Sequence, residues 1–412
     1  MVRDSLRRWI LMALLVVAMI SCYAHRGALG VAAPFMIRDH RLSPAVMGIL
    51  LSAFFWSYAL MQVPAGWLVD RFGVRWSYGA GYALWSIATV LTGLTRGFAA
   101  LIASRVLLGI GQATAFPASA RAVSNWYEDR TRGIVSAGYL TGVRLGQAMV
   151  SAAGAFFLAA YGFKAFFVGL GIISMLWLPP WFSYLRRLEG VDSVPGTPPR
   201  QTRSRAGATF LQSLALFKHR SVLGIFLGFF AYDYAWFVYV NWLPGYLVLE
   251  RKFTTAEMGI FSSVPYLAMS IVILLSGFVS DALVRRGIRE TTARKTLIVI
   301  GLLFGCLIVP AGLVASRVAA VWLLTISLCG LGIATPNTWT LTQAVCSKRI
   351  VGTVSGIQNF GGNLGGILAP ALTGYIAHIT SSFAIALGIT GGILVFGIFC
   401  YGLLVKDRVD PS

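Results

Sequence analysis

Apolar segments long enough to cross a membrane alternate with short polar stretches along the whole chain. They fall at residues 9–33, 44–69, 76–95, 99–122, 132–158, 164–184, 221–249, 256–283, 295–315, 319–343, 351–377 and 382–405. A helix needs about 20 apolar residues to span the hydrocarbon core of a bilayer, because each residue adds about 1.5 Å to its length. The pattern therefore predicts an all-α integral membrane protein with twelve transmembrane helices.

The basic residues between these segments are distributed unevenly, and this predicts the orientation of the chain. Most Lys and Arg residues fall in the N-terminus, the even-numbered loops and the C-terminus. The odd-numbered loops carry Arg38, Arg41, Arg96, Lys164, Arg251, Lys252 and Arg317. Basic residues accumulate in cytoplasmic loops, so both termini are expected to be cytoplasmic.

The composition agrees with a membrane protein and argues against several other classes. The chain is 57% hydrophobic and 12% charged, whereas about 25% of the residues in a soluble domain are charged. Its net charge of +20 is dispersed among the loops, so no basic domain for nucleic acid is expected. The five cysteines and four histidines show no metal-ligand spacing. We therefore expect no enzyme active site, no metal and no cofactor.

One long polar break divides the chain into two halves. Residues 191–220 are rich in Pro, Ser, Thr and Arg, and they form the expected cytoplasmic linker between bundles at 1–190 and 221–412. The halves repeat each other: Met47-Gly48-Ile49 recurs as Met258-Gly259-Ile260, and Leu145-Gly146 recurs as Leu364-Gly365. Two related six-helix bundles around a site near the midplane are typical of transporters.

Three motifs identify a superfamily. The stretch from Gly66 to Arg75 and its repeat from Gly277 to Gly287 both resemble the GxxxDRxGxR signature of the major facilitator superfamily. The stretch from Arg105 to Gln112 resembles that superfamily's RxxxGxG motif. This resemblance implies transport by alternating access of the two bundles. It also implies structural or gating roles for Asp70, Arg71, Arg75, Arg105, Asp281, Arg285 and Arg286.

A finer resemblance covers four further stretches. The stretches 52–62, 116–118, 242–247 and 352–364 are similar to the anion:cation symporter family, which includes sugar-acid, phthalate and sialic-acid transporters. The resemblance implies a small organic anion as substrate, carried across the inner membrane by a protein that functions as a monomer. Whether that anion is a sugar acid, an aromatic carboxylate or a small hydroxy acid stays open.

Charged residues inside the expected spans are few and mostly basic. They are Arg26, Arg105, Arg121 and Arg144 against one acid, Asp233, with His25 as the one imidazole well inside a span. A charge at the bilayer centre costs at least about 3 kcal/mol, so each of these residues needs a partner or a function. Four cations cannot all pair with one carboxylate, and the surplus favours an anionic substrate.

Arg26 and Arg144 are the expected carboxylate anchors. A guanidinium grips a carboxylate with two parallel hydrogen bonds and stays charged. Arg144 lies near the middle of its span between two glycines, although pairing with Asp233 is an alternative role. Arg121 lies near a helix end, where a structural role is expected. For Arg105, a structural and a functional role both stay open.

Two positions depart from the pattern of the family. Helix 1 of the family reads Tyr-x-Asp-Arg, whereas this chain has Tyr23-Ala24-His25-Arg26. Gln112 stands where sugar-acid symporters of the family carry a glutamate. The proton-coupling acids of the family are therefore absent, and Asp233 and His25 are the candidate replacements. A fixed ion pair of Asp233 with an arginine is the alternative.

Further polar and aromatic side chains are candidates for contact with the substrate. They can supply hydrogen bonds or ring faces to a small carboxylate: Tyr23, Tyr58, Gln112, Tyr234, Trp339, Gln358, Asn359 and Asn363. Asn359 and Asn363 stand one helical turn apart and are expected to form one polar wall.

These features together predict secondary active transport of a small organic anion, driven by proton symport. The alternatives are a proton-independent facilitator or exchanger and, with less support, an exporter of neutral solutes or drugs. The surplus of arginines over acids inside the spans argues against cationic drugs. Apart from the anion, the expected partners are protons and the lipid bilayer.

Overall fold

The computed structural model describes residues 2–39, 42–95, 97–127, 129–191, 216–347, 350–406 and Val409, and it is built from helices. The chain divides into two compact units. The first comprises residues 1–42, 49–200 and 252–263, and the second comprises residues 43–48, 201–251 and 264–412. Most of the expected linker at 191–220 lies outside the described residues.

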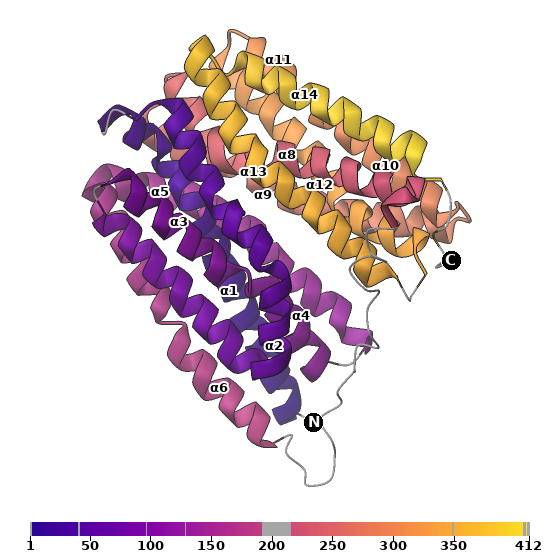
Figure 1. Cartoon of the computed structure of the whole chain (residues 1–412). Coiled ribbons are helices and arrows are strands. Elements are labelled where there is room, and N and C mark those ends of the chain that lie inside the picture. Colours follow the sequence, from indigo (N-terminus) through magenta and orange to yellow (C-terminus); the bar gives the residue numbers. More distant parts are fainter. Residues whose placement is uncertain are drawn as a thin grey trace. The chain divides into compact units, whose positions relative to one another are not determined.

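The first unit contains six helices, which Figure 1 shows in indigo to magenta. They are α1 (Val2–Asp39), α2 (Pro44–Leu94, whose first residues belong to the second unit), α3 (Phe98–Gln112), α4 (Ala115–Trp126), α5 (Asp129–Met175) and α6 (Leu178–Val191). The expected span at 99–122 is supplied by α3 and α4 in succession.

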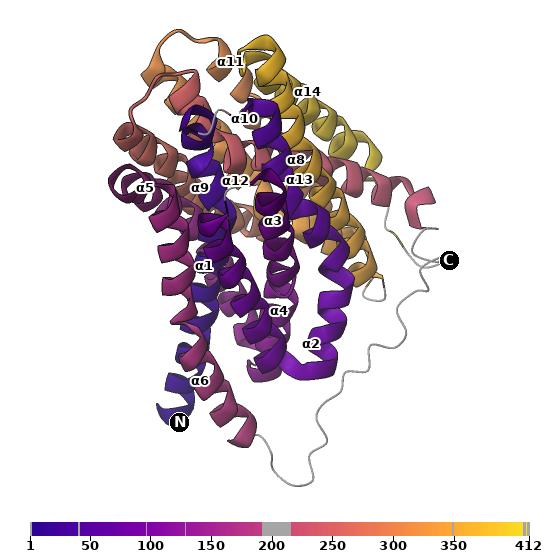
Figure 2. The same ribbon diagram turned by 60° about the vertical axis from the view of Figure 1, so that its left-hand side comes forward.

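Glycines with positive φ interrupt the two longest helices. Gly73 in α2 has φ 80°, and Gly162 in α5 has φ 77°, conformations that favour a residue without a Cβ. At Gly73 the chain turns back, and the Ser77 hydroxyl donates to the Leu68 carbonyl across the bend (Figure 2). Each interruption falls between two of the expected spans, so α2 and α5 each carry parts of two segments.

The second unit contains the remaining helices. They are α8 (Arg220–Leu249), α9 (Thr255–Arg285, whose first residues belong to the first unit), α10 (Glu290–Gly305), α11 (Ile308–Leu313), α12 (Arg317–Val345), α13 (Val351–Thr380) and α14 (Ala384–Phe399), with short helical turns at Leu216–Lys218 and Cys400–Leu404. Within this unit α8 packs along α13, and α10 packs along α12.

The described helices include nine that are long and apolar enough to cross a membrane. Two of the nine exceed 50 residues and contain the glycine interruptions at Gly73 and Gly162. The protein is therefore a multi-pass membrane protein. The expected total of twelve spans, the cytoplasmic termini and the symmetry of the halves stay predictions.

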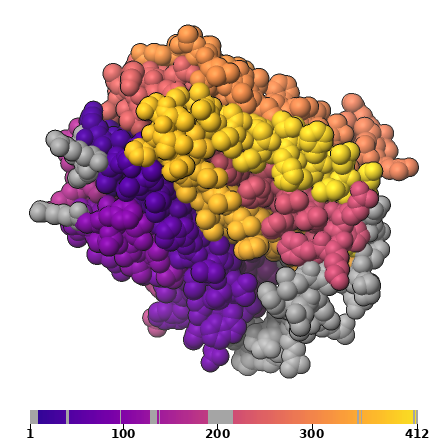
Figure 3. All heavy atoms as spheres, turned by 45° about the horizontal axis from the view of Figure 1, so that its top comes forward, coloured from indigo at the N-terminus to yellow at the C-terminus, as the bar shows by residue number. Residues whose placement is uncertain are grey.

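The helices place apolar side chains on the outside and many polar ones inside. In the second unit α14, yellow in the space-filling view, lies along the outer surface (Figure 3). Its exposed residues include Ile385, Ile389, Val395 and Phe399. A surface of this kind suits contact with lipid tails, which are as apolar as the side chains themselves.

Glycines allow the central helix pairs to approach closely. A Cβ on Gly142 of α5 would lie 2.8 Å from the carbonyl oxygen of Val16 on α1, and Gly146 contacts the Ile20 carbonyl one turn further. In the second unit Gly361 of α13 makes the equivalent contact with Phe226 on α8. The repeated glycines thus have the same packing role in both units.

Candidate anion site

Arg26 on α1 lies inside a cage of neutral side chains. Its guanidinium carbon is 4.5 Å from the ring centre of Tyr23, 4.6 Å from that of Phe54 and 4.7 Å from that of Tyr58. Its Nη1 donates to the Tyr23 hydroxyl at 3.2 Å, and its Nε donates to Oε1 of Gln112 at 3.2 Å. Ring faces stabilise a desolvated cation, so Arg26 is held inside the bundle without a carboxylate.

Gln112 at the end of α3 has a fixed orientation. Its Oε1 accepts from Arg26, while its Nε2 donates to the backbone carbonyl of Cys22 at 2.8 Å. An ionised carboxylate at this position can accept from Arg26 but cannot donate to Cys22. Gln112 therefore accepts one hydrogen bond and donates another, as a protonated carboxylic acid would, and it does so at every pH because an amide does not titrate.

One nitrogen of the Arg26 guanidinium lacks a protein partner. Arg26 is 2% exposed, and its buried Nη2 finds no hydrogen-bond acceptor among the described residues. Leaving such a donor unpaired costs about 1–3 kcal/mol, and more for a charged group. The free nitrogen belongs to the planar fork that binds carboxylates, so an anion there would compensate for this cost.

Arg105 on α3 is also buried and lacks a counter-ion. It is 2% exposed, its guanidinium carbon is 5.7 Å from the ring centre of Phe54, and its Nε has no partner among the described residues. No carboxylate in the described part of the chain lies within ion-pair distance of it. An ion pair of Arg105 with an acid, the structural role that the sequence left open, is therefore not found among the described residues.

On α5, Arg144 is 8% exposed and engages in an interaction of its own. One turn further along α5, Gln147 is fully buried, and neither atom of its amide has a partner among the described residues. This amide contacts Gly27, the residue next to Arg26. Gln147 was not among the predicted residues, although its place three residues after Arg144 within an apolar span was an available signal.

His25 points away from the Arg26 cage and connects three helical segments. Its Nδ1 lies 2.6 Å from the Thr89 hydroxyl on α2, and its Nε2 lies 2.6 Å from the Ser174 hydroxyl on α5. Both hydroxyls also donate to carbonyls of their own helices, Trp85 and Leu170. His25 is thus held by side chains that differ from those around Arg26.

The second unit holds the candidates from the other half of the sequence. Asp233 on α8 is half-buried, and its carboxylate lies against Gly362 on α13, where any larger residue would displace it. Asp233 also has an interaction partner of its own. Gly362 thereby leaves room for the one acid of the expected spans.

The remaining candidates of the second unit differ in exposure. Gln358 is buried and accepts from the Thr342 hydroxyl at 2.5 Å, while its Nε2 has no partner among the described residues. Tyr234 and Asn363 are buried, whereas Asn359 is half-buried. Trp339 is 36% exposed and packs edge-on against Phe229.

The expected gating residues of the first unit form ion pairs at helix ends. Asp70 pairs with Arg121 at 3.3 Å, and Arg75 pairs with Glu189 at 2.9 Å. Arg71 lies over the rings of Trp67 and Phe72 instead. Arg121 thus pairs with an acid near a helix end, which is a structural role of the kind expected for it.

In the second unit, Asp281 pairs with Arg294 of α10 at 2.8 Å. Arg285 and Arg286, the arginines of the motif itself, are exposed. Arg294 also donates to Ser280, whose hydroxyl donates to Asn337 of α12 at 2.7 Å. The sequence motif therefore located the acid but missed its basic partner.

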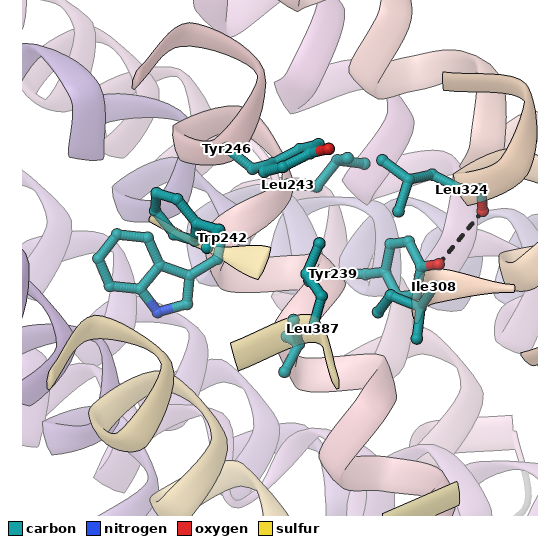
Figure 4. A pocket seen from close by; sticks show the side chains of 9 residues that line it. Tyr239, Trp242, Leu243, Tyr246, Ile308, Leu324 and Leu387 are labelled. Atoms are coloured by element: carbon teal, nitrogen blue, oxygen red, sulfur yellow. Dashed lines mark hydrogen bonds between the residues drawn. The ribbon is translucent and has the colours of Figure 1, made fainter. Parts of the chain in front are cut away.

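A separate small cavity in the second unit is apolar. It is lined by Val238, Tyr239, Trp242, Leu243, Tyr246, Ile308, Leu324, Phe383 and Leu387 (Figure 4). The hydroxyl of Tyr239 donates to the Leu324 carbonyl and that of Tyr246 to the Ala311 carbonyl, so both hydroxyl protons are already engaged. This cavity lacks the chemistry of an anion site. The described residues also contain no cluster of metal-ligating side chains.

Comparison with known proteins identifies the family. The Major Facilitator Superfamily model matches residues 14–370. The chain is 32% identical to a D-galactonate transporter of Escherichia coli O6:H1, covering 97% of this chain and 96% of that one. It is 30% identical to a hexuronate transporter of Bacillus subtilis, covering 91% and 89%. A protein of Escherichia coli K12 named "Probable galactarate/D-glucarate transporter" is 28% identical, covering 97% and 95%.

Solved structures show the same fold at low sequence identity. A bacterial homologue of the human lysosomal transporter Spinster superposes with a TM-score of 0.78 at 19% identity, covering 98% of this chain and 99% of that one. A D-xylose-proton symporter superposes with a TM-score of 0.76 at 15% identity, covering 97% and 98%.

The chain belongs to the major facilitator superfamily, and its relatives include transporters named for sugar acids. The resemblance expected from the motifs is therefore confirmed. The protein is therefore a transporter rather than an enzyme.

Proposed function

We propose that this protein carries a sugar acid across the inner membrane by alternating access of its two bundles. The observation that supports this most directly is the free Nη2 of Arg26, a buried charged donor whose other nitrogens are held by Tyr23 and Gln112. A substrate carboxylate supplies the acceptor that the protein leaves out.

The other side chains of the site suit the hydroxyl groups of a sugar acid. Gln147 offers a buried amide that can both donate and accept, and Tyr58 offers a ring face beside Arg26. Arg144, Asn359 and Asn363 are proposed as further substrate contacts. The names of the relatives support a sugar acid over an aromatic acid.

Binding measured with matched ligands tests this proposal. D-galactonate and D-galactose have the same carbon skeleton, but the sugar lacks the carboxylate. We expect D-galactonate alone to raise the unfolding temperature of the purified protein, because a ligand that binds the folded state stabilises it. Arg26→Gln should abolish the shift, while the exposed Arg187→Gln should keep it. An equal shift with D-galactose would indicate a carrier of neutral solutes.

For the energy source we propose proton symport through Asp233, the half-buried acid beside Gly362. Uptake into proteoliposomes with and without an imposed pH gradient tests this. Asp233→Asn should still exchange substrate but should no longer concentrate it. If the variant still concentrates substrate in response to the gradient, Asp233 is not the coupling residue, and His25 becomes the next candidate.

A second mode of transport, without protons, is favoured by one observation. Gln112 holds Arg26 through an amide that cannot titrate, so the charge around Arg26 does not change with pH at this position. Uptake that is independent of the pH gradient in the wild-type protein would support this exchanger or facilitator.

A further inference from the structure

Arg105 is a buried cation that the proposed monocarboxylate site leaves without a function. It is 2% exposed, and its Nε lacks a partner among the described residues. Its guanidinium carbon lies 5.7 Å from the ring centre of Phe54. A buried charge without hydrogen bonds is strongly unfavourable, so the folded protein needs an anion or another compensating group at this place.

Other buried or half-buried arginines of the chain have partners in the protein. Arg294 pairs with Asp281 at 2.8 Å. Arg251 donates to the carbonyls of Val314 and Ala311 at 2.6 and 2.7 Å. Arg144 has an interaction of its own. Arg26 and Arg105 differ from Arg251 and Arg294, because neither donates to a carboxylate or to a backbone carbonyl among the described residues.

These two guanidiniums share an aromatic neighbour. The carbon of Arg26 is 4.6 Å from the centre of the Phe54 ring, and that of Arg105 is 5.7 Å from the same centre. Their separation cannot exceed the total of these two distances. One open-chain sugar acid with a carboxylate at each end could therefore bind both guanidiniums at once.

The charges of this region favour a dianion as well. Arg26 and Arg105 contribute two positive charges, and no carboxylate among the described residues lies within ion-pair distance of either. Gln112, which accepts from Arg26 and lies on the same helix as Arg105, is neutral. A ligand with one carboxylate neutralises only one of these buried charges, whereas a dicarboxylate neutralises both.

We propose that Arg105 binds a second carboxylate and that the substrate class is therefore the dicarboxylic sugar acids. This inference rests on the proposed function, because it assumes that Arg26 binds the first carboxylate. Arg26 and Arg105 hold the two ends of the substrate, and the aromatic cage of Tyr23, Phe54 and Tyr58 lies beside its carbon chain.

Galactarate and D-galactonate provide matched probes. They differ at one end, where galactarate has a carboxylate and D-galactonate has a hydroxymethyl group. Dissociation constants for both are measured with the purified full-length protein, for the wild type, for Arg105→Gln and for the exposed control Arg187→Gln. We expect wild type and control to bind galactarate about tenfold more tightly, equal to about 1.4 kcal/mol. Arg105→Gln should remove this preference.

Each other outcome has a definite meaning. The inference is overturned if the wild type binds D-galactonate as tightly as galactarate or more tightly, although the proposed function then stands. It is also overturned if Arg105→Gln weakens both ligands by the same factor or weakens neither. If the wild type binds neither acid, the proposed function itself fails. Binding of either acid by Arg105→Gln shows that the variant is folded.

Discussion

The Nε of Arg26 donates to Oε1 of Gln112 at 3.2 Å, while Nε2 of the same amide donates to the Cys22 carbonyl. This arrangement fixes one side of the guanidinium and leaves Nη2 free. The proposed anion site thus consists of an arginine, an amide and aromatic rings. Its charge does not depend on the protonation of a neighbouring acid.

Replacing Gln112 by Glu should make substrate binding depend on pH. A protonated glutamic acid can make both bonds of the amide, whereas an ionised one loses the bond to Cys22 and competes with the substrate for Arg26. Binding of D-galactonate to Gln112→Glu should be strongest at low pH and fall by about tenfold or more as the pH rises. Titration calorimetry across pH measures this. Parallel pH profiles for the variant and the wild type would contradict the proposed pairing.

Replacing Arg26 by Lys should not preserve binding, although the charge is kept. Lysine is a point charge with a flexible stem, and it cannot donate to Tyr23 and Gln112 while presenting a planar fork to a carboxylate. We expect the affinity for D-galactonate to fall by at least about tenfold, measured by the thermal shift at increasing ligand concentration. Wild-type affinity in Arg26→Lys would show that only the positive charge matters.

A methyl group at Gly146 should weaken the packing of α5 on α1. The added Cβ would collide with the carbonyl oxygen of Ile20, which is backbone and cannot turn aside. We expect Gly146→Ala to lower the free energy of unfolding by about 1–3 kcal/mol. Gly169→Ala, on the same helix but facing open space, is the matched control. Thermal unfolding in detergent compares them, and equal stability of the two variants would refute the close contact.

Arg294→Ala should destabilise the second unit more than Arg285→Ala. Arg294 is almost buried and binds Ser280 and Asp281, whereas Arg285 is exposed. Loss of buried hydrogen bonds costs about 1–3 kcal/mol, and an exposed arginine contributes little. Differential scanning fluorimetry of both variants measures the difference. A larger effect of Arg285→Ala would assign the partner of Asp281 to the motif's own arginine.

Much of the helix pattern could be predicted from the sequence, but the helix boundaries could not. The polar break around Gly73 separates two expected spans, and the structure turns at that residue. The expected span at 99–122 instead became α3 and α4 in succession. Hydropathy reports how apolar a segment is, whereas a helix ends where its local backbone hydrogen bonds end.

The same division applies to the candidate site. Arg26, Tyr23, Tyr58 and Gln112 were predicted as candidate contacts, and the structure brings them together. The unpaired amide of Gln147 and the unpaired Nε of Arg105 were not predicted, because nothing in the sequence shows which buried polar atoms lack a partner. That property depends on every neighbouring helix at once.

The sequence by itself determined the membrane class, the superfamily and the surplus of basic over acidic residues inside the spans, because these follow from residue type and order alone. The tertiary structure decided which arginines have an acidic partner and which have none. It paired Asp70 with Arg121 and Asp281 with Arg294, while Arg26 and Arg105 have no carboxylate partner among the described residues. Hydrogen bonds act over about 3 Å, so only the packing of helices far apart in the sequence can decide them.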